Sequence, residues 1–201
     1  MQRLRRSREA GVVLVAVLVW WGLCATAAGD DTRSACIYAG RTAAEWRALL
    51  GSHHRVVRLT ALKALGELHQ VDVLLQQLDS PDPAARYWAA FYLRFCRPLS
   101  RDAVAKLTAR LNDPDAMVRV TAAATLVRLG DGSSLSAIVK ELNNPQMGVV
   151  VWALTELRDL GRKAAEAEPG VRRRLTSNVS YYRRLAQEFL RRLGYKLDIK
   201  P

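Results

Sequence analysis

The chain has 201 residues, of which 50% are hydrophobic and 25% charged, and its formal net charge is +12. This balance excludes an intrinsically disordered chain, which would combine low hydrophobicity with high net charge. Gly and Pro are sparse, at 12 and 7 residues, and their regular spacing favours helices over strands.

The first 27 residues have the form of a secretory signal peptide. Four Arg in the first eight positions precede an uncharged run of 13 residues, 11–23, and residues 25–27 read Ala-Thr-Ala, an A-x-A cleavage site. A membrane-spanning helix needs about 20 apolar residues, so an uncleaved anchor is the less favoured interpretation. We therefore predict an exported protein, periplasmic or secreted, with a lead-in segment at 28–40.

An internal repeat occurs five times after the lead-in. Its anchor is an Ala with a Leu four residues later, at Ala61/Leu65, Ala89/Leu93, Ala122/Leu126, Ala153/Leu157 and Ala186/Leu190. Successive anchors are 28, 33, 31 and 33 residues apart, and mostly apolar side chains recur four residues before and seven after them. These offsets lie on one face of an α-helix, so each repeat is predicted to contain a helix that buries this face.

A shorter amphipathic segment precedes each anchored helix, and a turn rich in Asp, Asn, Ser and Pro joins the two. The segments span 43–50, 71–78, 101–111, 135–142 and 162–175. Such turn residues cap the helix that follows. Pro169-Gly170 interrupts the last segment, so its helix is expected to begin at Val171. Three glycines are predicted to end anchored helices in a left-handed conformation: Gly130, Gly161 and Gly194.

The pattern D-P-D-A-x-V-R-x-x-A-A-x-x-L-x-x-L-G at 113–130 resembles the short HEAT-like repeat, including the subgroup named after phycobilisome lyases. The resemblance covers about 41–194 and leaves 195–201 as a C-terminal tail. It implies an all-α fold, an α-solenoid (right-handed superhelix) of about five HEAT-like helix–turn–helix repeats. The sequence before Trp46 resembles the lead-in of exported bacterial HEAT-repeat proteins, in which this Trp would pack the first helix.

No catalytic or metal-binding motif appears in the sequence. The three histidines, His53, His54 and His69, lack further ligands at set spacing, and we interpret them as polar turn or helix-end residues. We therefore predict no enzyme activity, no cofactor, no metal and no small-molecule substrate. Cys96 falls in the apolar register seven residues after an anchor, which favours a buried hydrophobe over a reactive thiol. A Cys36–Cys96 disulfide is the less favoured alternative.

An Arg stands three residues before the anchor in four of the five repeats: Arg58, Arg86, Arg119 and Arg183. It could be interpreted as an anion-binding ladder. The family resemblance implies instead that this Arg bonds the acidic turn of a neighbouring repeat. Three acids are suitable partners: Asp82, Asp113 and Asp115.

The side of the anchored helices opposite the anchor carries a row of apolar residues in repeats two to four. Solenoids of this kind line their concave surface with second helices, and an exposed apolar strip there marks an interaction site. We predict a protein- or peptide-binding groove centred on Tyr87, Phe91, Val120 and Val151. The neighbouring aromatic residues are interpreted first as core and second as recognition residues: Trp88, Tyr92, Phe95 and Trp152.

The C-terminal end is basic, with eleven Lys or Arg and four Asp or Glu in 162–201. It is either the solvated face of a capping repeat or a weak binding site for anionic surfaces. The residues concerned are Arg172, Arg173, Arg174, Arg183, Arg184, Arg191 and Arg192. We do not expect nucleic acid as a partner.

The leading functional hypothesis is a non-catalytic exported scaffold or adaptor. It would bind a protein or peptide on the concave face. Two alternatives remain. One is a phycobilin-lyase-like enzyme, which only the name of the repeat subgroup suggests. The other is a binder of anionic surfaces or polymers through the basic C-terminal repeat.

Overall fold

The computed structural model describes residues 37–196. The predicted signal peptide, Cys36 and the end of the tail lie outside this range. The chain divides into two units, 1–34 and 35–201, and the fold described here belongs to the second unit.

Five pairs of helices follow one another along the described residues. The second helices of the pairs carry the anchors and are α2 (Arg55–Glu67), α4 (Pro83–Leu93), α6 (Ala116–Leu129), α8 (Met147–Leu160) and α10 (Ser180–Arg192). The first helices are α1 (Ala43–Leu49), α3 (Val71–Gln77), α5 (Arg101–Ala109) with η1 (Arg110–Asn112), α7 (Leu135–Glu141) after η2 (Gly132–Ser134), and α9 (Glu168–Arg172) between η3 (Gly161–Ala167) and η4 (Arg173–Thr176).

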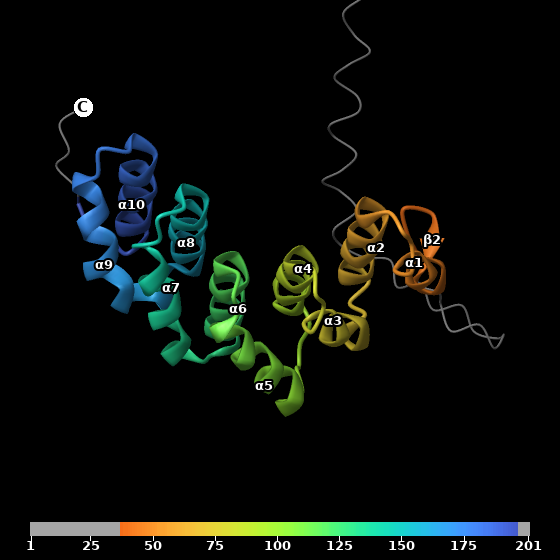
Figure 1. Ribbon diagram of the computed structural model, residues 1–201. Helices are drawn as coiled ribbons and strands as arrows, with labels where there is room; N and C mark the ends of the chain where they lie inside the picture. Colours follow the sequence, from red (N-terminus) through yellow and green to blue (C-terminus); the bar gives the residue numbers. More distant parts are fainter. Residues whose placement is uncertain (1–36, 197–201) are drawn as a thin grey trace, which may run out of the picture. The chain divides into compact units, whose positions relative to one another are not determined.

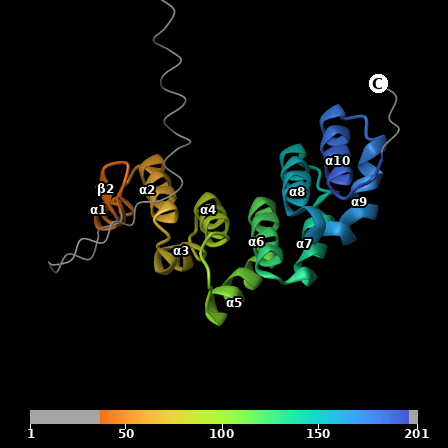
Figure 2. The ribbon, with the colours of Figure 1, turned by 180° about the vertical axis from the view of Figure 1, so that it is seen from behind.

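The helix pairs stack into an α-solenoid. Helices α2, α4, α6, α8 and α10 stand side by side along the inner face of an arch, while α3, α5, α7 and α9 lie along its outer face (Figures 1 and 2). The all-α solenoid predicted from the five-fold pattern is confirmed. The one addition is a short hairpin before α1.

The hairpin pairs β1 (Ile37–Tyr38) with β2 (Arg41–Thr42) in antiparallel register. Its two turn residues, Ala39 and Gly40, both have positive φ, as a tight two-residue turn requires. Thr42 then caps α1 through a reciprocal pair of hydrogen bonds with Glu45. The indole N–H of Trp46 donates to the Tyr38 carbonyl at 3.0 Å, and this side chain is buried, so the predicted packing role of Trp46 is confirmed.

All ten anchor residues are fully buried, which confirms the register that defined the repeat. The core has two parts. One extends from α1 to α6 and the other from α6 to α10. Helix α6 belongs to both, because Ala122 and Leu126 pack toward α4 whereas Val120 and Ala124 pack toward α8. A helix with apolar neighbours on nearly every side is the mark of a fully enclosed element.

The helix ends follow the predicted glycines. Gly130, Gly161 and Gly194 all have positive φ, and Gly130 and Gly194 are each followed by a six-to-one bond from the next N–H back into the helix. His69 takes the same role after α2 without being glycine. Repeat two lacks a closing glycine, and α4 ends earlier, at Leu93.

The prediction that the first helix of repeat five begins at Val171 is wrong. Helix α9 begins at Glu168 and includes Pro169 and Gly170. Proline lies here in the first turn, where its missing N–H would have had no helical partner. The segment before it, η3, continues directly from α8 as a 3₁₀ helix.

Candidate functional site

The turns inside the five repeats share one hydrogen-bonding pattern. Nine residues before each anchor, a polar side chain accepts the N–H two positions later at 2.9–3.2 Å, in the order Ser52, Ser80, Asp113, Asn144 and Ser177. Where the recurring Arg is present, it donates to the carbonyl of that same residue at 2.7–2.9 Å: Arg58, Arg86, Arg119 and Arg183. These Arg therefore brace their own turns, and the ladder has a structural role.

Two of these Arg also reach an acid of the following repeat. Arg86 forms a two-bond pair with Asp113, both bonds at 2.8 Å, and Arg119 donates to Glu141 at 2.7 Å. Burial alone would raise the pKa of Asp113, but the bonds from Arg86 hold it below its ordinary value. The predicted partner Asp113 is thus confirmed.

The other two predicted acids have different partners. Asp82 is bound by Arg55 at 2.7 and 2.8 Å, because Arg58 spends its donors on the carbonyls of its own turn. The Asp115 carboxylate caps α6 by accepting the backbone N–H groups of Met117 and Val118, and it pairs with no Arg among the described residues. Both acids were wrongly assigned to the recurring Arg.

The predicted concave strip is not continuously exposed. Val120, in its centre, is 0% exposed, as is Ala124 one turn later, so the expectation that Val120 lies open to a partner is wrong. Tyr87, Phe91 and Val151 are half-buried. The reason is that side chains from α4 and α8 close over α6.

This closure has an aromatic part. The rings of Tyr87 on α4 and Trp152 on α8 lie 5.7 Å apart between centroids, although α6 stands between the two helices. The Trp152 indole N–H donates to the Thr121 hydroxyl at 3.0 Å, and the Thr125 hydroxyl donates to the Ala90 carbonyl at 2.9 Å. Trp152 therefore belongs to the fold, as its primary interpretation predicted.

A buried charge cluster forms the second part of the closure. Arg94, at the end of α4, bonds Glu156 of α8 at 2.8 and 3.3 Å across 62 residues of sequence, and their side chains are 6% and 2% exposed. Arg128 of α6 bonds the same carboxylate at 2.8 Å. Burial lowers the pKa of the Arg94 guanidinium, and Glu156 opposes that shift. Sequence reasoning missed this cluster, because its spacing fits no local rule.

The concave face remains open over α2 and α4. Phe95 is 55% exposed and packs on Phe91 at a centroid distance of 5.7 Å. Phe91 in turn contacts the half-buried Trp88, over whose ring the exposed Lys63 ammonium lies at 4.5 Å. We call Lys63, Trp88, Phe91 and Phe95 the aromatic face.

Tyr92 is adjacent to this face but belongs to the core. Its ring packs against α2 at Gly66, where a Cβ would come within 2.2 Å of the ring. Its hydroxyl donates to Glu67 at 3.1 Å. The interpretation of these aromatic residues as core is therefore right for Tyr92 and wrong for Phe95.

The His and Cys side chains of the described residues do not gather in one cluster. Among residues 37–196, no three or more His, Cys, Asp or Glu side chains gather as metal ligands, and no helix is long and apolar enough to cross a membrane. Cys96 is a buried free thiol whose pKa burial raises, as its apolar register predicted. The three histidines are exposed.

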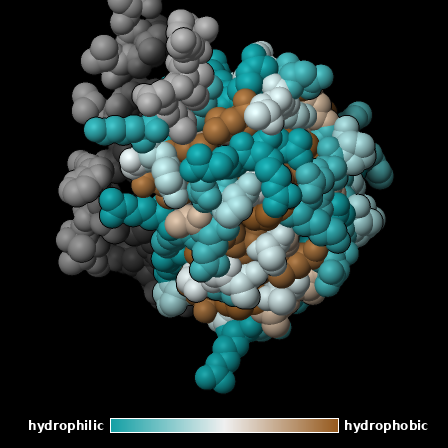
Figure 3. All heavy atoms as spheres, turned by 90° about the vertical axis from the view of Figure 1, so that its left-hand side faces the viewer, coloured by the Kyte–Doolittle hydropathy of each residue, from teal (hydrophilic) through white to brown (hydrophobic). Residues whose placement is uncertain are grey.

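The seven Arg of the basic end divide by their contacts. Arg172, Arg184 and Arg192 approach acids in ion pairs, with Glu168, Glu188 and Asp159. Arg183 braces its turn. Within residues 37–196, no acid lies in ion-pair distance of the remaining three, Arg173, Arg174 and Arg191. The end of the solenoid is largely hydrophilic with apolar areas between (Figure 3), as a capping repeat requires.

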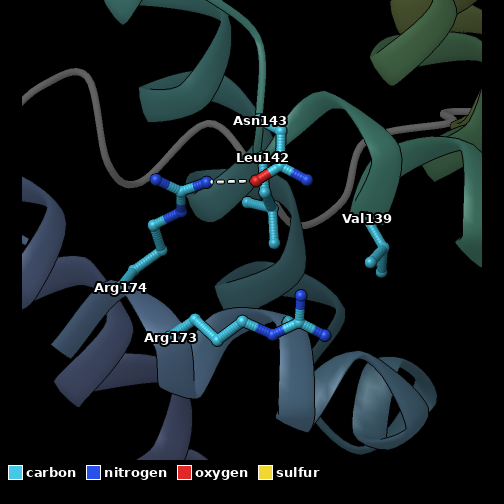
Figure 4. Close-up of a pocket in the computed structure, with 6 residues that line it drawn as sticks. Val139, Leu142, Asn143, Arg173 and Arg174 are labelled. Carbon is cyan, nitrogen blue, oxygen red and sulfur yellow. Dashed lines mark hydrogen bonds between the residues drawn. The ribbon is translucent and has the colours of Figure 1, made fainter. Parts of the chain in front are cut away.

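A small hollow lies beside two of these Arg, between α7 and η4. It is lined by Val139, Leu142, Asn143, Gly170, Arg173 and Arg174 (Figure 4). The placement of two Arg beside one hollow could not be predicted from the sequence, where the two residues were part of a general basic patch.

Residues 71–158 match the family model of HEAT repeats. This range contains α3 to α7 and most of α8, which include both the closure and most of the aromatic face. Among solved structures, an engineered protein is similar over 76% of this chain and 79% of its own, with 20% identity and a TM-score of 0.51. The complex of CpcE and CpcF of phycocyanin lyase from Nostoc is similar over 83% and 70%, with 24% identity and a TM-score of 0.57. No curated protein matches the sequence. At these identities the likeness extends to the fold.

Proposed function

We propose that this chain is a non-catalytic scaffold that binds a protein or peptide segment on the aromatic face of its first two repeats. The carrying observation is that Phe95, a large apolar side chain just after α4, is 55% exposed beside the Phe91 and Tyr92 rings. Aromatic residues are enriched at the energetic centres of protein interfaces, where they give large contact area at low entropic cost.

The geometry favours a segment with an apolar side chain and a nearby acid. Phe95 offers its exposed ring to an apolar group, and the exposed Lys63 ammonium lies over the nearby Trp88 ring. Repeats three and four present no equivalent surface, because their concave side is closed by Tyr87, Trp152 and the Arg94–Glu156 pair. Binding is therefore expected at one end of the arch.

Site-specific cross-linking tests this proposal. A photoreactive residue at position 95 is expected to capture the partner. In a separate affinity purification without the photoreactive residue, the variant with Phe95→Ser and Lys63→Glu is expected to lose the partner. The matched control carries Val56→Ser and Met147→Ser, two exposed apolar residues elsewhere at 77% and 54% exposure. Equal capture by both double variants would refute the proposed surface.

Export is part of the same proposal. Residues 1–27 have the pattern of a cleavable signal, so the chain is expected in the periplasm or medium with an N-terminus near residue 28. Cell fractionation and N-terminal sequencing of the purified protein test it. A cytoplasmic protein that retains residues 1–27 would contradict export without touching the binding surface.

The enzymatic alternative has a direct assay. The similarity to phycocyanin lyase is one of fold, and the described residues offer no acid–base pair beside a cavity suited to a bilin. Incubation with a bilin and an acceptor subunit is expected to give no covalent adduct, and a transferred bilin would replace the scaffold proposal.

A further inference from the structure

The hollow between α7 and η4 has a volume of about 180 Å³ and is lined by residues of repeats four and five, none of which belongs to the aromatic face. Val139 and Leu142 form its apolar wall, and Arg173 and Arg174 reach toward the end of α7 from below and beside it (Figure 4). Pockets for drug-sized ligands occupy roughly 300–1,000 Å³, so this hollow admits a single small group.

Gly170 lets α9 approach α7 at this point. A Cβ on Gly170 would lie 3.1 Å from a methyl carbon of Val139 and 3.4 Å from one of Leu142. The close approach brings η4, and with it the two Arg, beside the last turn of α7. The hollow is therefore a product of the packing of repeats four and five.

The charge in this hollow is not balanced by its lining, in which no acid takes part. Arg174 donates one bond to the Asn143 side chain at 2.5 Å, while its Nε is buried with no acceptor among residues 37–196. No side-chain bond of Arg173 is formed within the same range. A buried guanidinium N–H without an acceptor is costly, and a bound anion would satisfy it.

The end of α7 does not compete for these donors. Its last carbonyls, those of Val139, Lys140 and Glu141, already accept the N–H groups of residues 142, 143 and 144 at 3.1–3.2 Å. The negative end of the α7 dipole is thereby partly offset, and the guanidinium groups remain the dominant local charge.

We propose that this hollow binds one oxyanion group of the phosphate or sulfate class. Two planar guanidinium forks match such oxygens by paired hydrogen bonds, and the apolar wall excludes water from one side of the group. The source is either the free anion or a phosphate carried on a lipid headgroup, since the hollow takes only the charged group. This site is independent of the aromatic face.

The test titrates full-length mature protein with inorganic phosphate or sulfate at constant ionic strength, with chloride as reference. The Nε–H resonance of Arg174 is followed by NMR. Saturable shifts are expected with phosphate and sulfate and not with chloride. The variant with Arg173→Gln and Arg174→Gln is expected to bind about tenfold more weakly or worse, a loss of at least about 1.4 kcal/mol, with binding followed by calorimetry.

The control variant carries Arg162→Gln and Arg191→Gln. Both Arg are exposed and lie outside the hollow, so these substitutions remove the same amount of charge elsewhere. It is expected to bind normally, and equal loss in both variants would reduce the effect to general surface charge and overturn the site. Gly170→Ala narrows the hollow without a change of charge and is expected to weaken binding. Linear, unsaturable shifts would overturn the proposal.

Vesicles distinguish the two sources. Phosphatidylcholine vesicles with phosphatidic acid are compared with phosphatidylcholine alone. Binding that needs phosphatidic acid and Arg173/Arg174 assigns a lipid headgroup, and phosphate titration without vesicle binding assigns the free anion.

Discussion

The concave side of this solenoid differs between its first two repeats and the two that follow. Over α6 it is closed by residues that α4 and α8 extend toward each other, with Tyr87 against Trp152 and Arg94 against Glu156. Over α2 and α4 it is open, and Phe95 stands 55% exposed. The same repeat thus gives a sealed surface or an accessible one, depending on which side chains stand at positions outside the repeated register.

The difference shows that the curvature of the solenoid and the length of its side chains together decide whether the concave face is accessible to a partner. Helices α4 and α8 do not neighbour each other in the stack, yet the bend of the arch brings their long side chains within contact. In the open part, α2 presents Leu59 and Lys63 at the equivalent offsets, and Lys63 is exposed and lies over Trp88 of the adjacent α4. Partner binding is therefore expected where bridging fails.

The largest expected effect comes from the buried charge cluster. Glu156→Gln leaves the Arg94 guanidinium buried without its charge partner, which costs about 3–5 kcal/mol of unfolding free energy. Urea denaturation monitored by far-UV circular dichroism measures it. Replacement of both Arg94 and Glu156 by Met is expected to restore most of the loss, because both desolvation costs are removed together.

The control is Glu188→Gln on α10. Its carboxylate pairs with Arg158 at 3.3 Å but is 37% exposed, so the expected loss is about 0–1 kcal/mol. Equal losses for Glu156→Gln and Glu188→Gln would mean that the bridge contributes nothing to the closed region.

A second prediction concerns the enclosed helix. Val120→Ala removes two fully buried methyl groups and is expected to cost about 2 kcal/mol. Val151 stands at the same offset from its anchor on α8 but is half-buried. Val151→Ala is therefore expected to lower the unfolding free energy by less than half as much as Val120→Ala. Denaturation midpoints of the two variants test the comparison. Equal, small losses would mean that Val120 is open to solvent.

The fold could be predicted from the sequence because each repeat is defined by residues close to one another in the chain. Anchors, caps and turn residues recur within about thirty residues, and each recurrence supports the same helix register. The position of Val120 could not be found in this way. Val120 is buried in a helix whose two neighbours in the stack, α4 and α8, contact each other through Tyr87 and Trp152.

One signal for the enclosure of α6 was present in the sequence. The stretch from Val118 to Val127 is apolar or small on every side of the helix, apart from Arg119, and such a helix is normally buried all round. The prediction of an exposed strip assumed that the side of each second helix opposite the buried anchor faces solvent. The charged bridge had no such signal, because 62 residues separate Arg94 from Glu156.

A third prediction uses pH to probe the closure. Burial, followed by the Glu156 charge, raises the pKa of Tyr87 to about 12, above its ordinary value of 10.0. The folded state therefore keeps this proton where the unfolded chain has lost it. The resulting stability is fully present below pH 10 and is lost as pH rises toward 12, on the order of 1 kcal/mol.

The measurement compares the unfolding free energy of wild type with that of Tyr87→Phe between about pH 9 and pH 12. This range includes both the ordinary pKa of 10.0 and the raised pKa of about 12. The variant is expected to lose less stability over that range, and Tyr181→Phe, whose ring is exposed, serves as the control. Parallel pH dependence of Tyr87→Phe and wild type would contradict a raised pKa of Tyr87 in the folded state.

The smallest expected effect on stability is at the open face. Phe95→Ser removes a ring that is more than half exposed, so the unfolding free energy should change by no more than about 0.5 kcal/mol. A residue that contributes this little to folding and yet presents an aromatic ring to solvent is the kind expected at a binding surface. If Phe95→Ser instead costs as much as Val120→Ala, the ring belongs to the core, and the open and closed halves of the concave side would not differ. The denaturation curves of Phe95→Ser and Val120→Ala therefore show whether the Phe95 ring is available to a partner or is required for folding stability.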